Sequence, residues 1–351
     1  MGSSAEIQAK LKKDYGETTV VGGGDKYKDQ PRLPSGIFAF DLATGGGFPM
    51  GRPSIVYGPE SSGKTNLVLS AIGAGQVKFP DKKAVFIDAE SSYDPIWSQK
   101  LGVRIKDLIV CHPEYAEQAV DMIEAFMYAD DVFCVVLDSM AALTTQNEIE
   151  SDAGKMIVGG ASLLVGKLMK KVNASFTKMS NMDEVPPAFI AVNQIRHKIG
   201  VMFGDNETMP GGNAPRYTSA LTVRVYGKNE MEKKIHPVMP AYKKTSMIIK
   251  KWKVPILAMT SEYLMQMVDG GGRGAGHVED WNTVSNYLKE LDYLSKADKN
   301  KGWVLMGETY PTLIECRNAL YEDQELLQEV KETIIRELME TKALAAEEED
   351  G

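Results

Sequence analysis

A glycine-rich loop between a predicted strand and a predicted helix constrains the fold of this chain most. The loop reads Gly58-Pro-Glu-Ser-Ser-Gly-Lys-Thr65; it follows the apolar run Ser54–Tyr57 and precedes the helical pattern Asn66–Val77. In that context the pattern G-x-x-x-x-G-K-[ST] is typical of a loop whose backbone N–H groups bind phosphates at a helix N-terminus. Its residues are small because larger side chains would block the approach of the phosphates. The sequence therefore predicts a nucleotide-binding α/β fold.

We expect this loop to bind ATP together with Mg²⁺. The Lys64 ammonium would contact the β- and γ-phosphates, and the Thr65 hydroxyl would ligate the metal. The apolar run Phe133–Leu137 ends at Asp138, whose carboxylate would hold the metal through water. The predicted ATP-binding residues of the loop and the helix after it are Gly58, Pro59, Glu60, Ser61, Ser62, Gly63, Lys64, Thr65 and Asn66.

A second acidic segment is expected at the same edge of the sheet. The strand Ala84–Asp88 is followed by Glu90, and ligands of open α/β sheets bind beyond the carboxyl ends of the strands. Hydrolysis of ATP needs a group that orients the attacking water. The longer side chain of Glu90 is the candidate for that catalytic role, with Asp88 in the shell behind it.

Short apolar runs alternate with helical patterns through the middle of the chain. The predicted strands are Pro53–Tyr57, Ala84–Asp88, Phe133–Asp138, Phe189–Asn193, Leu221–Tyr226 and Met247–Ile249. Between the first four of these strands lie the helical patterns Lys64–Val77, Pro95–Leu101, Glu117–Tyr128 and Gly160–Phe176. These patterns predict a mostly parallel central sheet flanked by helices on both faces, with an antiparallel far edge where the later strands follow one another.

Four parts are predicted along the 351 residues. Residues 1–32 would form an arm and a linker, because Ala5–Tyr15 has an apolar stripe but is too short to be a stable helix alone. It is either a frayed terminus or an arm that docks on a neighbouring subunit. Residues 33–269 would form the core, 270–344 a small α-rich domain with helices at Trp281–Leu294 and Gln324–Leu344, and 345–351 an acidic tail. The glycine run Gly270–Gly276 is interpreted as a turn.

The composition excludes several classes of protein. No apolar run reaches the roughly 18 residues of a membrane-spanning helix, and Met1 does not begin a signal peptide. Cys111, Cys134 and Cys316 have neither the number nor the spacing of a disulfide framework or a metal site. We expect a reduced, cytoplasmic protein with no membrane partner.

Several motifs beyond the phosphate loop resemble the bacterial RecA family of homologous recombinases. They are Phe86-Ile-Asp-Ala-Glu90, Asp94-Pro95, Val135-Val-Leu-Asp-Ser139, Asn193-Gln-Ile-Arg196 and Lys198-Ile-Gly-Val-Met-Phe-Gly204 with Gly211-Gly-Asn213. The resemblance covers roughly residues 33–255 and is most specific at 193–213. It implies a P-loop ATPase core of the RecA type, and it favours the docked arm over the frayed terminus.

The resemblance also implies roles for residues outside the phosphate loop. Gln194 would sense the γ-phosphate and begin a DNA-binding loop, while Asp94 and Trp97 would contact adenine; Trp97 stands where the family usually has Tyr. Lys251 and Lys253 would contact the ATP of the neighbouring subunit and make hydrolysis depend on assembly.

Two loops are predicted to bind DNA. The resemblance assigns 150–160 to the first and 195–217 to the second, and the second combines basic, glycine and apolar residues that suit phosphates and bases. The first ends in Val158-Gly159 where the family commonly has Met-Gly, a shorter wedge between bases. The predicted DNA-binding residues are Val158, Gly159, Lys170, Arg196, Lys198, Ile199, Gly200, Phe203, Gly211, Gly212, Asn213 and Arg216.

The net charge of −8 does not argue against a DNA partner, because it lies at one end of the chain. Residues 322–350 hold eleven acidic and three basic side chains, so the rest of the chain is neutral. The stretch Tyr226–Lys253 has a net charge of +6 and is either a solvated face or a guide for a second DNA. We expect the acidic end to compete with duplex DNA for such basic surface.

The resemblance implies an ATP-dependent strand-exchange recombinase that acts in homologous recombination and repair. It would form helical filaments of itself on single-stranded DNA, pair that strand with homologous double-stranded DNA, and hydrolyse ATP in a DNA-stimulated manner. Single-strand-binding and mediator proteins would be further partners. One alternative is a ring-shaped DNA helicase of the same core fold, although such motors commonly use an arginine finger where this chain has Lys251 and Lys253. Another is an ATP-gated DNA-binding scaffold without hydrolysis, against which Glu90 argues.

Overall fold

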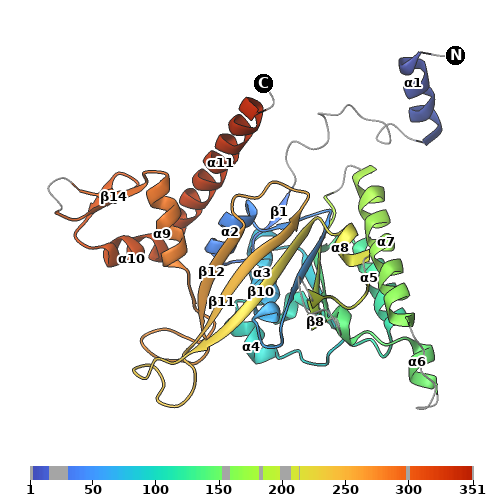
Figure 1. Cartoon of the computed structure of the whole chain (residues 1–351), viewed down its shortest axis with the longest axis horizontal. Coiled ribbons are helices and arrows are strands. Elements are labelled where there is room, and N and C mark those ends of the chain that lie inside the picture. Colours follow the sequence, from blue (N-terminus) through green and yellow to red (C-terminus); the bar gives the residue numbers. More distant parts are fainter. Residues whose placement is uncertain are drawn as a thin grey trace.

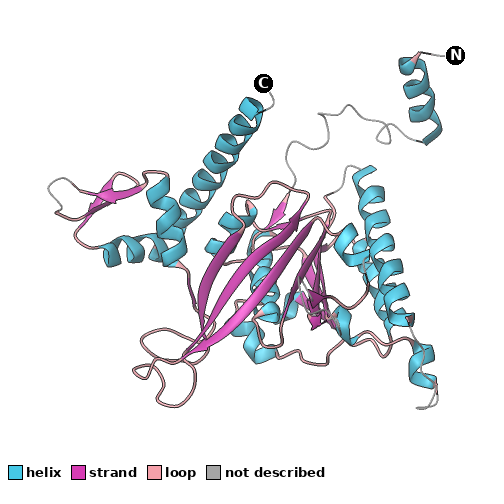
Figure 2. Ribbon diagram, in the orientation of Figure 1, coloured by secondary structure: helices cyan, strands magenta, loops and turns pink. Residues whose placement is uncertain are grey.

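The computed structural model describes residues 3–15, 31–151, 159–181, 185–197, 207–212, 214–297 and 301–349. A large twisted sheet forms the middle of the molecule, and helices cover both of its faces (Figures 1 and 2). A smaller lobe built from the C-terminal residues lies against one side of this core (Figure 1).

The central sheet has nine strands among the described residues, in the order β13-β12-β11-β10-β3-β7-β6-β4-β5. The strands from β3 to β5 in that order are parallel, and β10 also runs parallel to β3. From β10 outward the pairing is antiparallel, which confirms the expected far edge. The strands are β3 (Pro53–Gly58), β4 (Lys83–Asp88), β5 (Leu108–Cys111), β6 (Val132–Asp138), β7 (Ala188–Gln194), β10 (Leu221–Glu230), β11 (Tyr242–Trp252), β12 (Thr260–Gln266) and β13 (Val278–Glu279).

The central strands are continuous apolar runs because both faces of the sheet are buried. Along β6, Cys134 and Val136 face one core, and Val135 and Leu137 face the other. Helix α3 covers the first face, whereas α5 and α7 cover the second. The helices of this part are α2 (Phe38–Thr44), α3 (Lys64–Lys78), α4 (Pro95–Lys100), α5 (Ala116–Met127), α6 (Gln146–Glu150), α7 (Gly160–Asn181) and α8 (Ala214–Thr218), with short 3-10 turns at Ile105–Asp107 and Met140–Ala142.

The strand register brings the predicted site residues to one edge of the sheet. Gly58, the last residue of β3, is paired with Gln194, the last of β7. Asp88 of β4 is paired with Asp138 of β6 in the same way. The carboxyl ends of these parallel strands therefore lie together, where ligands bind in open α/β sheets.

The C-terminal lobe contains more strand than the sequence predicts. Three short strands form an antiparallel sheet between its helices, at positions where the pattern indicates only helix or loop. A strand of three residues is too short for its alternation of apolar and polar residues to be recognised in the sequence. The elements are α9 (Trp281–Glu290), β14 (Leu294–Lys296), β15 (Trp303–Leu305), β16 (Glu308–Tyr310), α10 (Leu313–Glu322) and α11 (Gln324–Glu349).

Helix α2 joins the lobe to the core, and all seven of its residues are buried. Phe40 and Ala43 belong to the apolar core beneath the sheet, while Phe38 and Leu42 belong to the core of the lobe. The buried Asp280 carboxylate accepts hydrogen bonds from the Ala39 N–H (2.9 Å) and from the Tyr321 hydroxyl. One carboxylate thus links the two parts of the chain.

The remaining elements are short. The expected N-terminal helix is present as α1 (Ser4–Tyr15), and its start is capped reciprocally by Ser3 and Glu6. Two minor antiparallel pairs join β1 (Arg32–Leu33) to β2 (Phe48–Pro49) and β8 (Arg196–His197) to β9 (Glu207–Thr208). Among the helices that the structure describes, none is both long enough and apolar enough to cross a membrane.

Candidate nucleotide site and DNA-binding loops

The phosphate loop has the backbone shape that its residue types predict. It connects β3 to α3, and Ser61 and Gly63 have positive φ angles of 55° and 95°. A side chain on Gly58 is excluded, because a Cβ there would lie 2.2 Å from the Val225 carbonyl oxygen on β10. The loop is therefore held tightly against the neighbouring strand, with the N-terminus of α3 at its end.

Lys64 lies within this loop and is almost completely buried. Its Nζ donates hydrogen bonds to the carbonyl oxygens of Pro59 (2.6 Å) and Gly58 (3.2 Å). Burial lowers the pKa of Lys64, and the nearby carboxylates of Asp138 and Glu90 oppose that shift. The ammonium group is thus placed across the loop, among acidic partners.

Thr65 and Asp138, which the sequence predicts to hold a metal directly and through water respectively, are in contact with each other. The Thr65 hydroxyl donates a hydrogen bond to Oδ2 of Asp138 across 2.7 Å. Asp138 is 1% exposed, and burial raises its pKa to about 6. A hydroxyl and a buried carboxylate are ligands that suit a hard cation such as Mg²⁺. Among the described residues, a cluster of three or more His, Cys, Asp or Glu side chains that could hold a metal ion is not found.

Glu90 lies where three strand ends meet. Its Oε1 accepts hydrogen bonds from the Ser139 hydroxyl, which follows β6, and from the Gln194 amide at the end of β7 (3.0 Å). Asp88 is buried and accepts hydrogen bonds from the backbone N–H groups of Ser92 (3.1 Å) and Tyr93 (3.0 Å). Asp88 therefore shapes the turn, whereas the exposed Glu90 is available to a ligand.

Asp94 and Trp97 lie on one wall of a pocket of about 380 Å³. Asp94 caps α4 by accepting hydrogen bonds from the N–H groups of Ile96 (2.8 Å) and Trp97 (3.1 Å). The Trp97 indole N–H donates to Oδ1 of Asn66 (2.9 Å), the residue after Thr65. The pocket is thus connected to the phosphate loop through one hydrogen bond, which fits a nucleotide that extends from phosphates to base.

Comparisons with known proteins agree with this geometry. A family model described as the RecA N-terminal domain matches residues 4–267. Protein RecA of Bacillus subtilis (strain 168) is 37% identical over 289 residues, which cover 82% of this chain and 78% of that protein. Protein RecA of Thermus thermophilus is 32% identical over 345 residues, or 97% of this chain and 95% of that protein. This chain belongs to the RecA family. Its role is therefore that of a RecA recombinase in homologous recombination and repair.

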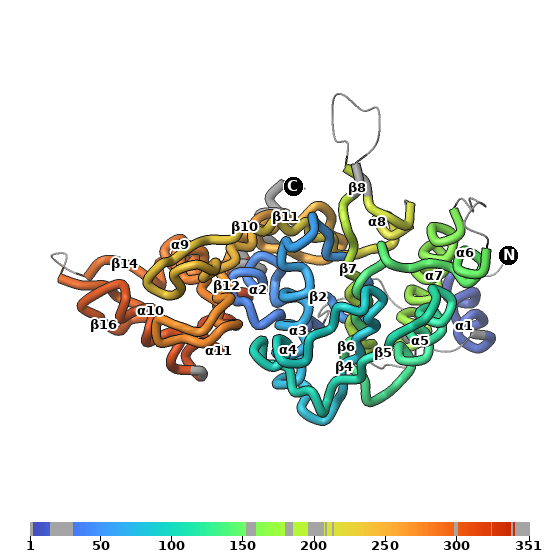
Figure 3. The backbone as a smooth tube through the Cα atoms, turned by 90° about the horizontal axis from the view of Figure 1, so that it is seen from below, coloured from blue at the N-terminus to red at the C-terminus, as the bar shows by residue number. Residues whose placement is uncertain are grey.

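The predicted second DNA-binding loop of this RecA-family chain is described only at its two ends. Arg196 in β8 pairs with Thr208 in β9, and β8 continues from the end of β7 (Figure 3). The Asn193 amide donates to the Pro210 carbonyl oxygen across 3.0 Å and so holds the returning strand. The predicted DNA-binding residues Lys198, Ile199, Gly200, Phe203 and Asn213 lie outside the described residues.

Helix α7 supports the end of that loop. Gly211 and Gly212 have φ angles of 92° and 69°, and a Cβ on Gly211 would lie 2.7 Å from Cγ1 of Val165 on α7. Arg216 on α8 and Lys170 on α7 are exposed and accessible to a polyanion. In the predicted first DNA-binding loop Gly159 is described, with a φ angle of 91°, and Val158 lies outside the described residues.

Lys251 and Lys253 lie at and just beyond the end of β11, close to α8. Both ammonium groups donate hydrogen bonds to the Tyr217 carbonyl oxygen, at 2.8 Å for Lys251 and 3.1 Å for Lys253, and Lys251 also donates to the Arg216 carbonyl oxygen. Burial, together with the positive charges of Lys253 and Arg216, lowers the pKa of Lys251 to about 8. Within one RecA chain the two lysines thus form a basic cluster beside the end of the predicted second DNA-binding loop.

Several residues near the RecA phosphate site have no recognisable signal in the sequence. Lys243 of β11 donates to the Ser61 carbonyl oxygen across 2.6 Å, and burial lowers its pKa. A Cβ on Gly227 of β10 would lie 2.6 Å from Cα of Ser62. Both residues belong to the basic stretch 226–253, which we interpret from the sequence as a solvated face or a guide for a second DNA and not as part of the phosphate site. Ser139 ends one of the family motifs, and its contact with Glu90 depends on the meeting of three strands.

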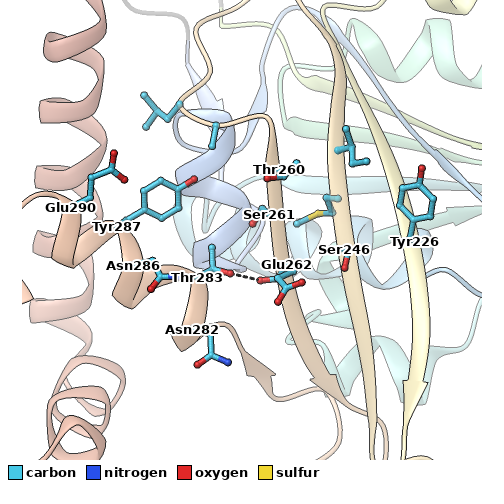
Figure 4. A pocket seen from close by; sticks show the side chains of 14 residues that line it. Tyr226, Ser246, Thr260, Ser261, Glu262, Asn282, Thr283, Asn286, Tyr287 and Glu290 are labelled. Carbon is cyan, nitrogen blue, oxygen red and sulfur yellow. Dashed lines mark hydrogen bonds between the residues drawn. The ribbon is translucent and has the colours of Figure 1, made fainter.

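A larger groove of about 870 Å³ lies elsewhere, between α9 and the outer strands β10 to β12. Tyr287 and Asn286 of α9 face Glu262 and Ser246 of the sheet across it, and the Thr283 hydroxyl donates to the Glu262 carbonyl oxygen (Figure 4). None of the residues that line it belongs to the phosphate loop or the Glu90 cluster. Its size alone does not make it the nucleotide site of this RecA-family protein.

Proposed function

We propose that this protein is a DNA-dependent ATPase whose nucleotide state controls its binding to DNA. It binds ATP with Mg²⁺, forms helical filaments on single-stranded DNA, pairs that strand with homologous duplex, and hydrolyses ATP to release the product. Membership of the RecA family establishes the role in recombination and repair. The ATPase cycle, the partners and the roles of individual residues belong to this proposal.

The residues present fit ATP and Mg²⁺. The loop from Gly58 to Gly63, the N-terminus of α3 and the Lys64 ammonium would hold the phosphates, and Thr65 with Asp138 would hold the ion. Mg²⁺ bound there would supply charge neutralisation for the β- and γ-phosphate oxygens. Glu90 would orient the attacking water, and Asp94 with Trp97 would contact the base.

The observation that carries the proposal is the contact of Glu90 with Gln194. Gln194 is both the last residue of β7 and the residue immediately before the second DNA-binding loop. A side chain that positions water is therefore hydrogen-bonded to a side chain whose backbone leads into a DNA contact. Such a pair supports hydrolysis that responds to DNA, because either ligand can change the geometry of the other's residue.

Assembly would complete the site. Lys251 and Lys253 lie on β11 and its extension, and in the proposal they contact the ATP of an adjacent subunit in the filament. Helix α1 would dock on that neighbour. The exposed Arg216 and Lys170, with the predicted residues of both loops, would neutralise DNA phosphates.

The test is ATP hydrolysis by the purified full chain with and without single-stranded DNA, together with strand exchange between a circular single strand and a homologous linear duplex. We expect hydrolysis that rises at least tenfold with DNA, and joint molecules that require homology. Electron microscopy with a slowly hydrolysed ATP analogue should show helical filaments on the single strand. Closed rings without joint molecules would indicate a motor and contradict the proposal, as would hydrolysis that is indifferent to DNA.

A further inference from the structure

The pocket beside Trp97 is lined in part by residues that the nucleotide motifs do not predict. Besides α4, it is lined by Met267 and Asp269 after β12 and by His236 from the connection between β10 and β11. That connection spans residues 231–241, and it brings its imidazole to the pocket from a part of the chain far from the phosphate loop in sequence. Three separate segments thus line one open pocket of about 380 Å³.

The glycine run after β12 explains why the connection can come so close. A Cβ on Gly270 would lie 3.0 Å from Cγ2 of Ile235, and one on Gly271 would lie 3.4 Å from its Cγ1. The Met267 N–H also donates to the Ala241 carbonyl oxygen across 2.8 Å. The first residues of the run Gly270–Gly276 form the surface on which Ile235 packs. Because His236 follows Ile235 in the sequence, this packing holds His236 beside the pocket.

The imidazole of His236 is fixed by its own loop. Its Nδ1 accepts hydrogen bonds from the N–H groups of Met239 (2.8 Å) and Val238 (3.3 Å). Nδ1 must be unprotonated to accept them, so in the neutral ring the hydrogen is on Nε2. The ring therefore has one remaining polar group, an Nε2–H donor, on a side chain that lines the pocket.

We propose that His236 contacts the purine base of the bound nucleotide and contributes to the selection of that base. The inference rests on the proposed ATP site and adds a residue to it. The Nε2–H would donate to a ring nitrogen of the purine, while Asp94 and Trp97 hold the base from α4. Lys100 and Asp269, which also line the pocket, form an ion pair of 3.0 Å with each other. Their charges are thus mutually compensated at the rim.

The experiment measures dissociation constants by isothermal titration calorimetry on the full chain with Mg²⁺. Two ligands are compared: ATP, and inorganic tripolyphosphate, which has the phosphates without the base. His236→Ala removes both functions of the ring. His236→Asn is the sharper variant, because its Oδ1 lies where Nδ1 accepts the backbone N–H groups but the side chain no longer reaches as far as Nε2. Lys234→Ala, an exposed change in the same loop, is the matched control.

We expect both His236 variants to weaken ATP about 5- to 10-fold, the value of one hydrogen bond, and to leave tripolyphosphate unchanged. Lys234→Ala should bind both ligands like the wild type. Wild-type affinity for ATP in His236→Asn would overturn the inference, since the ring would then only shape its loop. An equal loss for both ligands would also overturn it. If the wild-type protein bound neither ligand, or if Lys64→Ala did not weaken tripolyphosphate, the ATP site itself would be wrong.

Discussion

The Gln194 amide donates a hydrogen bond to the Glu90 carboxylate across 3.0 Å, although 104 residues separate them in sequence. The contact exists because β7 and β4 end at the same edge of the sheet, on either side of β6. Ser139, which follows β6, donates to the same Glu90 oxygen. A carboxylate with two donors on one oxygen is held in a defined orientation, as a group that positions water requires.

Replacing Glu90 should separate binding from hydrolysis. Glu90→Gln preserves the size of the side chain but removes the charge that attracts a proton from water, so DNA-stimulated hydrolysis should fall at least 100-fold. ATP affinity should stay within about threefold, and filaments should still form. Phosphate release and calorimetry measure the two properties. The control is Glu114→Gln, an exposed acid outside the cluster. Normal hydrolysis by Glu90→Gln would assign the water to another residue.

Lys64 should couple nucleotide to DNA. Lys64→Ala removes the buried ammonium that spans the loop, and we expect the ATP-dependent increase in single-stranded DNA affinity to disappear. Fluorescence anisotropy of a labelled oligonucleotide, with and without a slowly hydrolysed ATP analogue, measures it. Lys106→Ala changes an exposed lysine and should retain the increase. The phosphate site would be misplaced if Lys64→Ala still responded to the analogue.

Lys251 predicts an alkaline limit for the DNA-stimulated ATPase. Burial, with the charges of Lys253 and Arg216, lowers its pKa to about 8, so the side chain loses its charge as the pH rises through that value. If the positive charge is needed across the subunit interface, activity should decline between about pH 7 and 9. Lys251→Arg stays charged in this range and should flatten the decline. An unchanged profile in Lys251→Arg would remove Lys251 from the active assembly.

Asp41 should make the stability of the chain depend on pH. It is buried in α2 and accepts the Ser35 N–H (2.8 Å); burial raises its pKa to about 6, and Lys331 opposes the shift. In the unfolded chain the pKa of an Asp side chain is about 3.9, so the folded state binds the proton more tightly than the unfolded state. The folded chain therefore loses stability as the pH rises from about 4 to 6. Asp41→Asn removes this pH-dependent contribution to stability, because an amide does not titrate. Relative to the wild type, the variant should gain about 3 kcal/mol of unfolding free energy between about pH 4 and 7.

Scanning calorimetry of both proteins across that range measures the difference. Comparing the two proteins at each pH removes the titration of groups that they share. A difference in melting temperature that does not vary with pH would show that Asp41 titrates alike in the folded and unfolded chains.

The phosphate loop and the parallel strands could be predicted because each is encoded by neighbouring residues. The contact between Thr65 and Asp138 joins residues that are 73 positions apart, and it could be expected only because both lie beyond the carboxyl ends of predicted parallel strands. A strand followed by Gly58 and a helix after Lys64 is a local pattern. The role of Lys243 could not be predicted in this way, since it depends on the register of β11 against β10 and of β10 against β3. For the same reason the position of His236 beside the pocket could not be predicted, since it depends on the packing of Ile235 against Gly270 and Gly271.

The outer strands show a second limit. Runs such as Leu108–Cys111 and Val278–Glu279 are too short to show a period, and pairing with a longer neighbour makes them strands. The main helices of the core, in contrast, could be predicted to within a few residues. Helices α5 and α7 each have an apolar face long enough to recognise, whereas α3 is buried on most sides and is predicted from its place after the phosphate loop. The short strands that the sequence pattern did not predict are thus formed by pairing with neighbouring strands and not by local preference.

Helix α2 has a consequence for how the chain can be shortened. The RecA N-terminal match ends at residue 267, yet Phe38 and Leu42 pack in an apolar core whose other residues follow it. A chain cut at that boundary would expose two large apolar side chains and leave the Ala39 N–H without the carboxylate of Asp280. The C-terminal lobe therefore shields one side of α2, near the beginning of the core, from solvent, and any substitution in the lobe has to preserve this burial.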